Sequence, residues 1–223
     1  MVRSQGSQES RVETKQIQAK TLILSVVAVA LVEAGCGLTT AAFNPLIRLG
    51  VARVLEIAFV VWTVHVLEGN VTPLGLDRAR WFAGLRKGLF WSAGFGVLSG
   101  IAFVILLLGG INPLNFARTA LPKGSLDLLL FFLVGGVVAP VAEEVFFRGV
   151  LYGFLRRWGI ALALVLSTVA FAVMHGLGHG FPLTQVVGGI LFAAAYEVEK
   201  TLLVPIAIHC LGNLVIFVLS LIS

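Results

Sequence analysis

The chain has 223 residues, of which 58% are hydrophobic and 12% are charged, and its mean hydropathy is +1.01. A soluble domain carries about 25% charged residues, so this composition excludes a soluble globular protein and indicates a polytopic membrane protein. The formal net charge of +5 fits basic residues at inner loops and anionic headgroups, and no soluble basic patch or RNA-binding motif indicates a nucleic-acid partner.

Hydropathy divides the chain into a polar tail and one membrane domain. Residues 1–20 are polar and are expected to lie in water, and residues 21–223 are expected to form a single transmembrane domain. The predicted fold class is all-α, a polytopic transmembrane bundle of about seven to eight helices. The expected spans are 21 to about 43, 52–67, 88–110, 126 to about 154, 160–174, 182–196 and 204–221.

Three of these spans, 52–67, 160–174 and 182–196, are short against the ~20 residues that a full crossing needs. They are either sheltered by neighbouring helices or longer than the hydropathy indicates. An inward N-terminus is predicted, because most lysines and arginines then fall on inner segments. The basic residues that fall in outer loops are then Arg48, Arg53, Arg118 and Lys123.

The fourth span carries charges that a bilayer core disfavours. Glu143, Glu144 and Arg148 lie within six residues of an otherwise apolar run, and each charge at mid-bilayer depth costs roughly 2.5–3.5 kcal/mol. Glu144 and Arg148 are four apart and share a helical face, which predicts a charge-assisted pair. Glu143 is rotated by about 100° and has no local partner, which suits a general base or a metal ligand. The alternative is a structural Glu–Arg network that locks two helices together.

Two later spans offer polar residues at the same helical spacing. Phe171 and His175 share a face at the end of the fifth span, where a lone histidine is more often interfacial than catalytic. His179 follows among glycines that predict a loop, so it is a weaker candidate. His209 and Asn213 share a face inside the seventh span, which predicts a catalytic pair or an interhelical hydrogen bond.

Together these groups indicate hydrolysis of an acyl or peptide bond in the core of the bundle. Glu143, His175 and His209 are a ligand set that holds a divalent metal such as zinc and leaves a position open for water. Without a metal, the same groups take a proton from water and donate hydrogen bonds to an oxyanion. The sequence contains no His-Glu-x-x-His motif, no Gly-x-Ser-x-Gly motif and no aspartate pair within the spans.

The three motifs, in this order on successive apolar segments, resemble the CPBP family. They are Glu143-Glu144-x-x-x-Arg148, Phe171-x-x-x-His175 and His209-x-x-x-Asn213. That family comprises CAAX prenyl endopeptidases of the Ras-converting type and their bacterial relatives, also called Abi proteins. The resemblance covers about residues 125–215, which we take as the expected catalytic core.

The resemblance implies an all-helical intramembrane endopeptidase. By motif position, Glu143 and His175 would activate the attacking water, and His209 and Asn213 would stabilise the oxyanion. Glu144 and Arg148 match the remaining motif positions and are assigned a supporting role, with Phe171, because of their pairing geometry. The family is described both as metalloproteases and as metal-free glutamate proteases, so a divalent metal, zinc in particular, and no cofactor at all stay open.

The expected partners are the lipid bilayer and a membrane-presented peptide or protein, lipidated or not. The short polar tail is typical of a bacterial member, which predicts an inner (plasma) membrane location. Two other classes of function stay open. One is a non-catalytic scaffold or a bacteriocin self-immunity protein. The other is a proton-coupled transporter, although the sequence shows no internal repeat of the kind that such transporters carry.

One difficulty concerns depth in the membrane. The predicted topology puts His175 near the outer end of the fifth span and His209 in the inner part of the seventh. A single site needs the two histidines at one level. Either the glycine-rich segment 176–180 dips into the bundle or a predicted span boundary is wrong, and we expect the boundary error.

Overall fold

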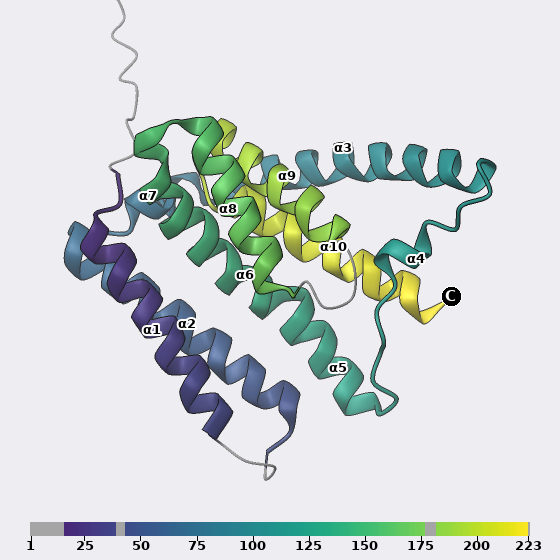
Figure 1. Ribbon diagram of the computed structural model, residues 1–223, viewed down its shortest axis with the longest axis horizontal. Coiled ribbons are helices and arrows are strands. Elements are labelled where there is room, and N and C mark those ends of the chain that lie inside the picture. Colours follow the sequence, from purple (N-terminus) through teal and green to yellow (C-terminus); the bar gives the residue numbers. More distant parts are fainter. Residues whose placement is uncertain (1–15, 39–42, 177–181, 223) are drawn as a thin grey trace, which may run out of the picture.

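The computed structural model describes residues 16–38, 43–176 and 182–222, and these ranges fold as helices joined by short connections (Figure 1). A short helix, α4 (Leu114–Ala117), accompanies seven long helical segments. The prediction of an all-α transmembrane bundle of about seven to eight helices is confirmed. The long segments are α1 (Ala19–Leu38), α2 (Pro45–Glu68), α3 (Trp81–Leu108), the continuous rod α5–α7 with its terminal turn (Ser125–Trp158), α8 (Ile160–Met174), α9 (Leu183–Glu199) and α10 (Leu203–Leu221).

Five segments are long and apolar enough to cross a membrane, namely α1, α2, α3 with the turns before it, the rod and α10, while α8 is shorter. Two helices begin seven residues earlier than expected, α2 at Pro45 rather than at 52 and α3 at Trp81 rather than at 88. Asn44 accepts hydrogen bonds from the backbone amides of Leu46 and Ile47, and proline suits the first turn of a helix. The Asn-Pro pair therefore starts α2, and the predicted short span is a full one.

This earlier start corrects the expected topology of two charges. Arg48 and Arg53 lie inside α2, not in an outer loop. The inward N-terminus stays a prediction. Most of the polar tail lies outside the described residues, but Ile17 is fully buried and α1 begins two residues later, at Ala19.

The backbone of the rod departs from regular α-helical geometry on both sides of the motif that it carries. Two π-helical stretches, Val134–Val138 and Val145–Tyr152, flank the α-helical turns Ala139–Glu144 that form α6. Pro140 has no amide hydrogen to donate to the preceding turn, which explains the widened winding before it. Wide turns change the rotation between successive side chains, so they re-aim the carboxylates of α6 relative to an ordinary α-helix.

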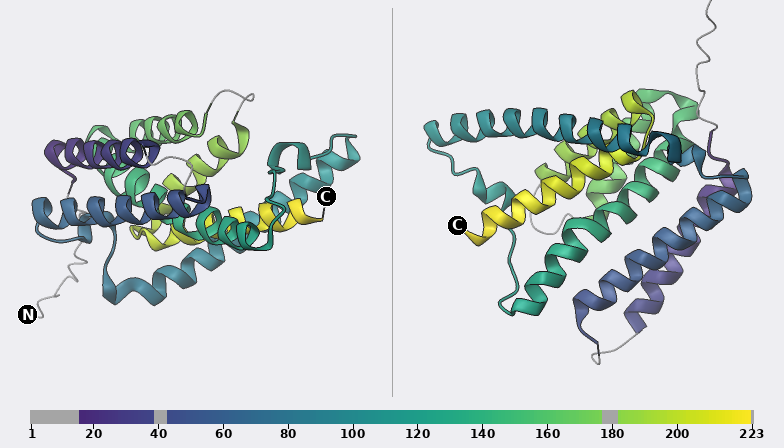
Figure 2. Two further views of the ribbon diagram at one scale, coloured as in Figure 1. Left: turned by 90° about the horizontal axis from the view of Figure 1, so that it is seen from below. Right: turned by 180° about the vertical axis from the view of Figure 1, so that it is seen from behind.

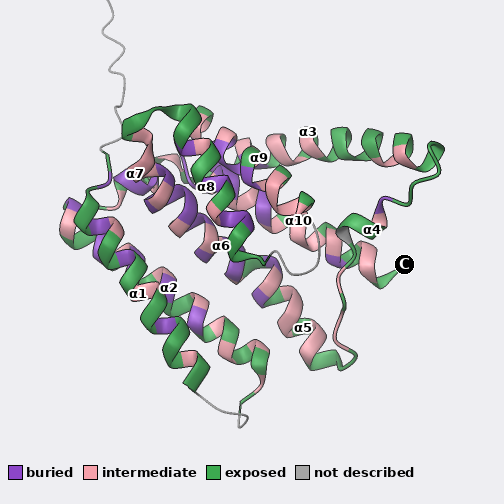
Figure 3. Cartoon of the chain, in the orientation of Figure 1, coloured by how far each residue is buried: buried purple, intermediate pink, exposed green. Residues whose placement is uncertain are grey.

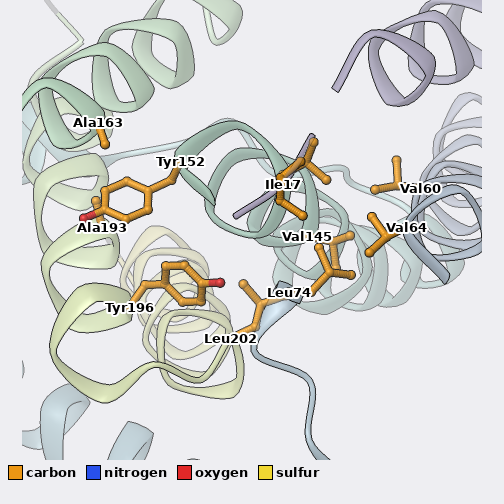
Figure 4. Close-up of a cluster of buried hydrophobic side chains, with 11 residues drawn as sticks. Ile17, Val60, Val64, Leu74, Val145, Tyr152, Ala163, Ala193, Tyr196 and Leu202 are labelled. Carbon is orange, nitrogen blue, oxygen red and sulfur yellow. The ribbon is translucent and has the colours of Figure 1, made fainter. Parts of the chain in front are cut away.

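The rod runs through the middle of the molecule, with the α1–α2 hairpin along one side and α8, α9 and α10 on the other (Figures 1 and 2). Figure 3 shows that buried residues gather where these elements face each other, whereas most of α3 is exposed. One buried cluster joins Val60 and Val64 of α2 to Val145 of the rod and to the Tyr152–Tyr196 pair (Figure 4). Exposed apolar side chains on the outer faces of the helices suit contact with lipid.

Close packing of α3 against α10 depends on a glycine. A Cβ placed on Gly88 would lie 2.6 Å from Ala207 Cβ, whereas one on Gly94 of the same helix meets nothing within 4 Å. Gly88→Ala should therefore destabilise the protein by about 1–3 kcal/mol through overpacking, and Gly94→Ala should be neutral or stabilising by up to about 1 kcal/mol. Thermal unfolding in detergent measures both, and equal effects of the two variants would contradict this packing.

Candidate active site

Three predicted residues from three separate helices meet at one carboxylate oxygen. The Oε2 atom of Glu143, in α6, lies 3.5 Å from Nε2 of His175 and 3.7 Å from Nε2 of His209. His175 follows the last residue of α8, and His209 lies in the second turn of α10. The side chains of Glu143 and His175 keep 18% and 30% of their exposure, while His209 is buried, so the cluster is reached from the His175 side.

The predicted pair between Glu144 and Arg148 is confirmed, and a histidine joins it. Arg148 Nη1 lies 2.8 Å from Glu144 Oε1, and both side chains are fully buried. The same oxygen lies 2.9 Å from Nδ1 of His209. Arg148 also donates through Nη2 to the carbonyl oxygen of Gly189 at 3.3 Å. Glu144 therefore connects the arginine of its own helix to the catalytic candidate on α10.

Aromatic rings enclose this network. The guanidinium of Arg148 lies 4.6 Å from the ring centre of Phe171 and 5.1 Å from that of Phe192, distances at which a cation interacts with a ring face. Phe192 also stacks on His209, with ring centres 4.5 Å apart and planes at 22°. Phe171 lies 4.4 Å from the ring of His175, so the shared face predicted for these two is confirmed.

The sequence analysis missed the contribution of α9. Gly189 and Phe192 are three residues apart and share a face there, yet neither carries a charge that would mark it in an apolar span. Gly189 lets α9 approach α8 closely, because a Cβ at this position would lie 2.8 Å from Thr168 Cγ2. The only available signal was one aromatic ring among small residues, which is weak.

Hydrogen bonds at Nδ1 define how the two histidines face Glu143. The Nδ1 atom of His175 lies 2.8 Å from the carbonyl oxygen of Phe171, which only accepts, so Nδ1 carries the hydrogen. In His209, Nδ1 donates to the carboxylate of Glu144. In the neutral rings, both Nε2 atoms then present lone pairs toward Glu143. Three acceptors around one point suit a water molecule that donates its hydrogens or a shared proton.

The structure also answers the question of depth. Both suspect helices have the predicted boundaries to within one residue, so the expected boundary error was wrong. Instead, α10 begins inside the molecule: Thr201 and Leu202 are buried, and the amide of Leu202 donates to the carbonyl oxygen of Gly75 at 3.2 Å. The start of α10 thus already lies inside the molecule. His209, six residues farther along α10, therefore lies at the same level as the end of α8.

A comparison with family models matches residues 125–215 to the type II CAAX prenyl endopeptidase Rce1-like family. The match covers less than half of the chain and includes all three motifs. The predicted resemblance is thereby confirmed over the residues that carry the three motifs. No solved structure matches the chain.

Two curated relatives agree with this partial match. The protein is 29% identical to "Putative membrane peptidase YdiL" of Bacillus subtilis, over 61% of this chain and 62% of the relative. It is 30% identical to "Membrane-embedded CAAX protease MroQ" of Staphylococcus aureus, over 51% of this chain and 47% of the relative. The chain thus matches about half to three fifths of the length of these relatives, and both names describe membrane peptidases.

Asn213 lies one helical turn beyond His209 in this Rce1-like site. Its amide nitrogen donates to the carbonyl oxygen of Gly135 at 2.9 Å, in the first π-helical stretch of the rod. A second amide hydrogen is left for a substrate oxygen, and the oxyanion role of Asn213 stays a prediction. His179, the weaker candidate, lies outside the described residues.

The donor set was also compared with what a divalent metal requires. Zinc needs three or four donors at about 2.0–2.3 Å around one point. Among the described residues, no group of three or more His, Cys, Asp or Glu side chains is arranged to hold a metal ion. The geometry of Glu143, His175 and His209 as it stands does not fit the ion, so the steps proposed below use side chains only, and zinc binding stays a prediction from the sequence.

Proposed function

We propose that this protein is an intramembrane endopeptidase of the CAAX-protease type. It hydrolyses a peptide bond in a membrane-presented peptide or protein, lipidated or not, with a water molecule activated by Glu143 and His175. The observation that carries the proposal is the convergence of His175 and His209 on Glu143, at 3.5 and 3.7 Å, within an Rce1-like segment. The names of both bacterial relatives, which describe membrane peptidases, support it, and the location that we propose is a bacterial inner (plasma) membrane.

In the proposed reaction, Glu143 and Nε2 of His175 accept a proton from water as its oxygen attacks the scissile carbonyl carbon. A carboxylate and an imidazole in this arrangement act as a general base, and the proton then passes to the leaving amine. The hydrogen bond from Nδ1 of His175 to the carbonyl of Phe171 holds the ring with Nε2 facing Glu143.

In the proposed reaction, His209 and Asn213 stabilise the oxyanion. Because Glu144 accepts the Nδ1 hydrogen of His209, it also stabilises the imidazolium that forms when Nε2 takes up a proton from the aqueous phase before the attack, and His209 keeps this proton through the reaction. That imidazolium donates from Nε2 to the oxyanion, and Asn213 donates its second amide hydrogen. Arg148 holds Glu144 in place through their ion pair, so Glu144 and Arg148 are positioning residues.

The decisive assay presents candidate peptides to the purified protein in liposomes and identifies the products by mass spectrometry. The proposal predicts cleavage at one defined peptide bond. A protein that never cleaves but still protects cells or assembles partners is a scaffold or immunity protein. A protein that moves protons or solutes across the vesicle membrane instead is a transporter.

Removal of metal ions distinguishes a metal-free reaction from a metal-dependent one. Because the steps above use side chains alone, we expect the protein to keep its cleavage rate after dialysis against a chelator. Elemental analysis of the same sample provides the control for complete removal. A rate that is lost on chelation and restored by zinc would contradict the metal-free reaction and make Glu143, His175 and His209 the first candidates for its ligands.

A further inference from the structure

A proline lies inside the rod, one turn before the two adjacent glutamates. Pro140 is fully buried and is the second residue of α6. A proline within a helix has no amide hydrogen, so the carbonyl group that this hydrogen would serve loses its helical donor. In lipid, a carbonyl group of this kind needs a donor from a neighbouring element.

The winding of the rod identifies the carbonyl group that loses its donor. In the stretch Val134–Val138 the hydrogen bonds span five residues, as in the bond from the amide of Ala139 to the carbonyl oxygen of Val134. In the same register, the next amide along the chain would donate to the carbonyl oxygen of Gly135. That next residue is Pro140, so this bond cannot form.

Asn213 of α10 supplies the missing donor. Its Nδ2 atom donates to the carbonyl oxygen of Gly135 at 2.9 Å. Helix α10 packs along the rod at this stretch (Figure 1). Glycine permits the close approach, because a Cβ on Gly135 would lie 3.2 Å from Phe217 Cζ of α10. The short asparagine side chain therefore reaches a backbone carbonyl group of the rod across the interface between the two elements.

The bond to Gly135 also defines the orientation of the Asn213 amide. A carbonyl oxygen only accepts hydrogen bonds, so the amide atom that faces it is the nitrogen and not Oδ1. The second hydrogen on this nitrogen points away from Gly135, and Asn213 is half-buried, so this hydrogen is accessible to substrate. An amide without this bond would also present Oδ1, an acceptor, to a developing negative charge. A donor that is oriented in advance stabilises an oxyanion without the cost of reorientation.

We propose that Pro140 is a positioning residue for the oxyanion donor Asn213. Because the proline cannot donate to Gly135, it leaves a backbone carbonyl group that binds Asn213 and directs the second N–H toward the face that Asn213 shares with His209. The effect on catalysis rests on the proposed peptidase function. The choice of donor at Gly135 does not depend on that function.

A kinetic double-mutant cycle tests the proposal. Asn213→Ala should lower kcat by roughly 10²- to 10³-fold, the effect of losing one oxyanion donor. Pro140→Ala restores an amide that competes for Gly135, so it should lower kcat by roughly 10- to 100-fold at an unchanged KM. In the Asn213→Ala background, the same proline change should alter kcat by no more than roughly two-fold, because the donor that it disturbs is absent.

Pro45→Ala is the matched control, since it restores an amide in the first turn of α2, where no helical carbonyl group needs it. This variant should leave kcat unchanged in both backgrounds. An equal loss of kcat on Pro140→Ala with and without Asn213 shows that the proline acts elsewhere, on the orientation of Glu143 for example, and overturns the proposal.

Reversible unfolding in mixed micelles tests the same coupling without catalysis. Asn213→Ala should raise the unfolding equilibrium constant by roughly 5- to 100-fold, because it leaves the carbonyl group of Gly135 without this donor. Asn115→Ala, at an exposed asparagine of α4, should leave the constant unchanged. In the Pro140→Ala background, Asn213→Ala should have at most a roughly two-fold effect, because the amide of residue 140 then serves Gly135.

The first of these comparisons keeps the native proline, so it does not depend on the folding of Pro140→Ala. An unchanged unfolding constant in Asn213→Ala, or equal effects of this change in the two backgrounds, overturns the role of Pro140. Coupling in the unfolding cycle with no cleavage by wild-type protein overturns the peptidase function instead, and the replacement of a proline amide by Asn213 at Gly135 stands.

Discussion

Glu143→Gln is expected to lower kcat for peptide cleavage by roughly 10²- to 10⁴-fold, the range that general-base catalysis contributes. Glutamine keeps the size of the side chain and removes only its capacity to take a proton from water. Since Glu143 contacts the two histidines at 3.5 and 3.7 Å rather than forming a buried ion pair, folding should be preserved. The measurement is single-turnover cleavage in liposomes, followed by mass spectrometry.

Histidine variants supply the matched comparison. His175→Ala should lose activity to a similar extent, because its Nε2 faces the same carboxylate oxygen. His65→Ala replaces an exposed histidine of α2 and should change nothing. Cleavage at the wild-type rate by Glu143→Gln would remove this carboxylate from the mechanism, and with it the main argument for the peptidase.

Arg148→Ala is expected to destabilise the protein by about 3–5 kcal/mol, since it leaves a buried charge without its partner. Glu144 is fully buried and would keep only its contact with His209. The guanidinium also packs against the rings of Phe171 and Phe192, so its removal opens a cavity as well. Reversible unfolding in mixed micelles measures the change, and Arg78→Ala, at an exposed arginine, is the control.

A double variant separates charge from packing. Arg148→Met with Glu144→Gln removes both charges and keeps most of the volume, so part of the lost stability should return. Activity should stay low in this variant, because His209 no longer has a carboxylate at Nδ1. If the double variant is less stable than Arg148→Ala alone, burial of an unpaired charge is not the cause of the loss.

The sequence predicted the helices well, because each apolar segment is a local property. The fifth span, 160–174, has the bounds of α8, and the seventh differs from α10 by one residue. The error at Asn44 arose because a polar residue followed by proline marks both the end of one helix and the start of the next. The pairing of Glu144 with Arg148 was also predictable, since both residues lie on one face of one helix.

Contacts between helices could not be predicted from patterns within single segments of the sequence. That His209 binds Glu144, that Phe192 of α9 stacks on this histidine, and that both histidines reach Glu143 all depend on tilt and depth. The buried start of α10 sets the level of His209, and no pattern near that residue reports it. Arg53, by contrast, was assigned to a loop because of the local boundary error at the start of α2.

By itself, the sequence determined an all-helical membrane protein, the order of its spans and the three motifs that relate residues 125–215 to the Rce1-like family. Periodicity and composition suffice for this because they act within one segment. Only the tertiary structure decided which polar groups share a site and how the histidines are oriented. The physical reason is that polar groups in lipid must find partners, and packing across helices selects those partners.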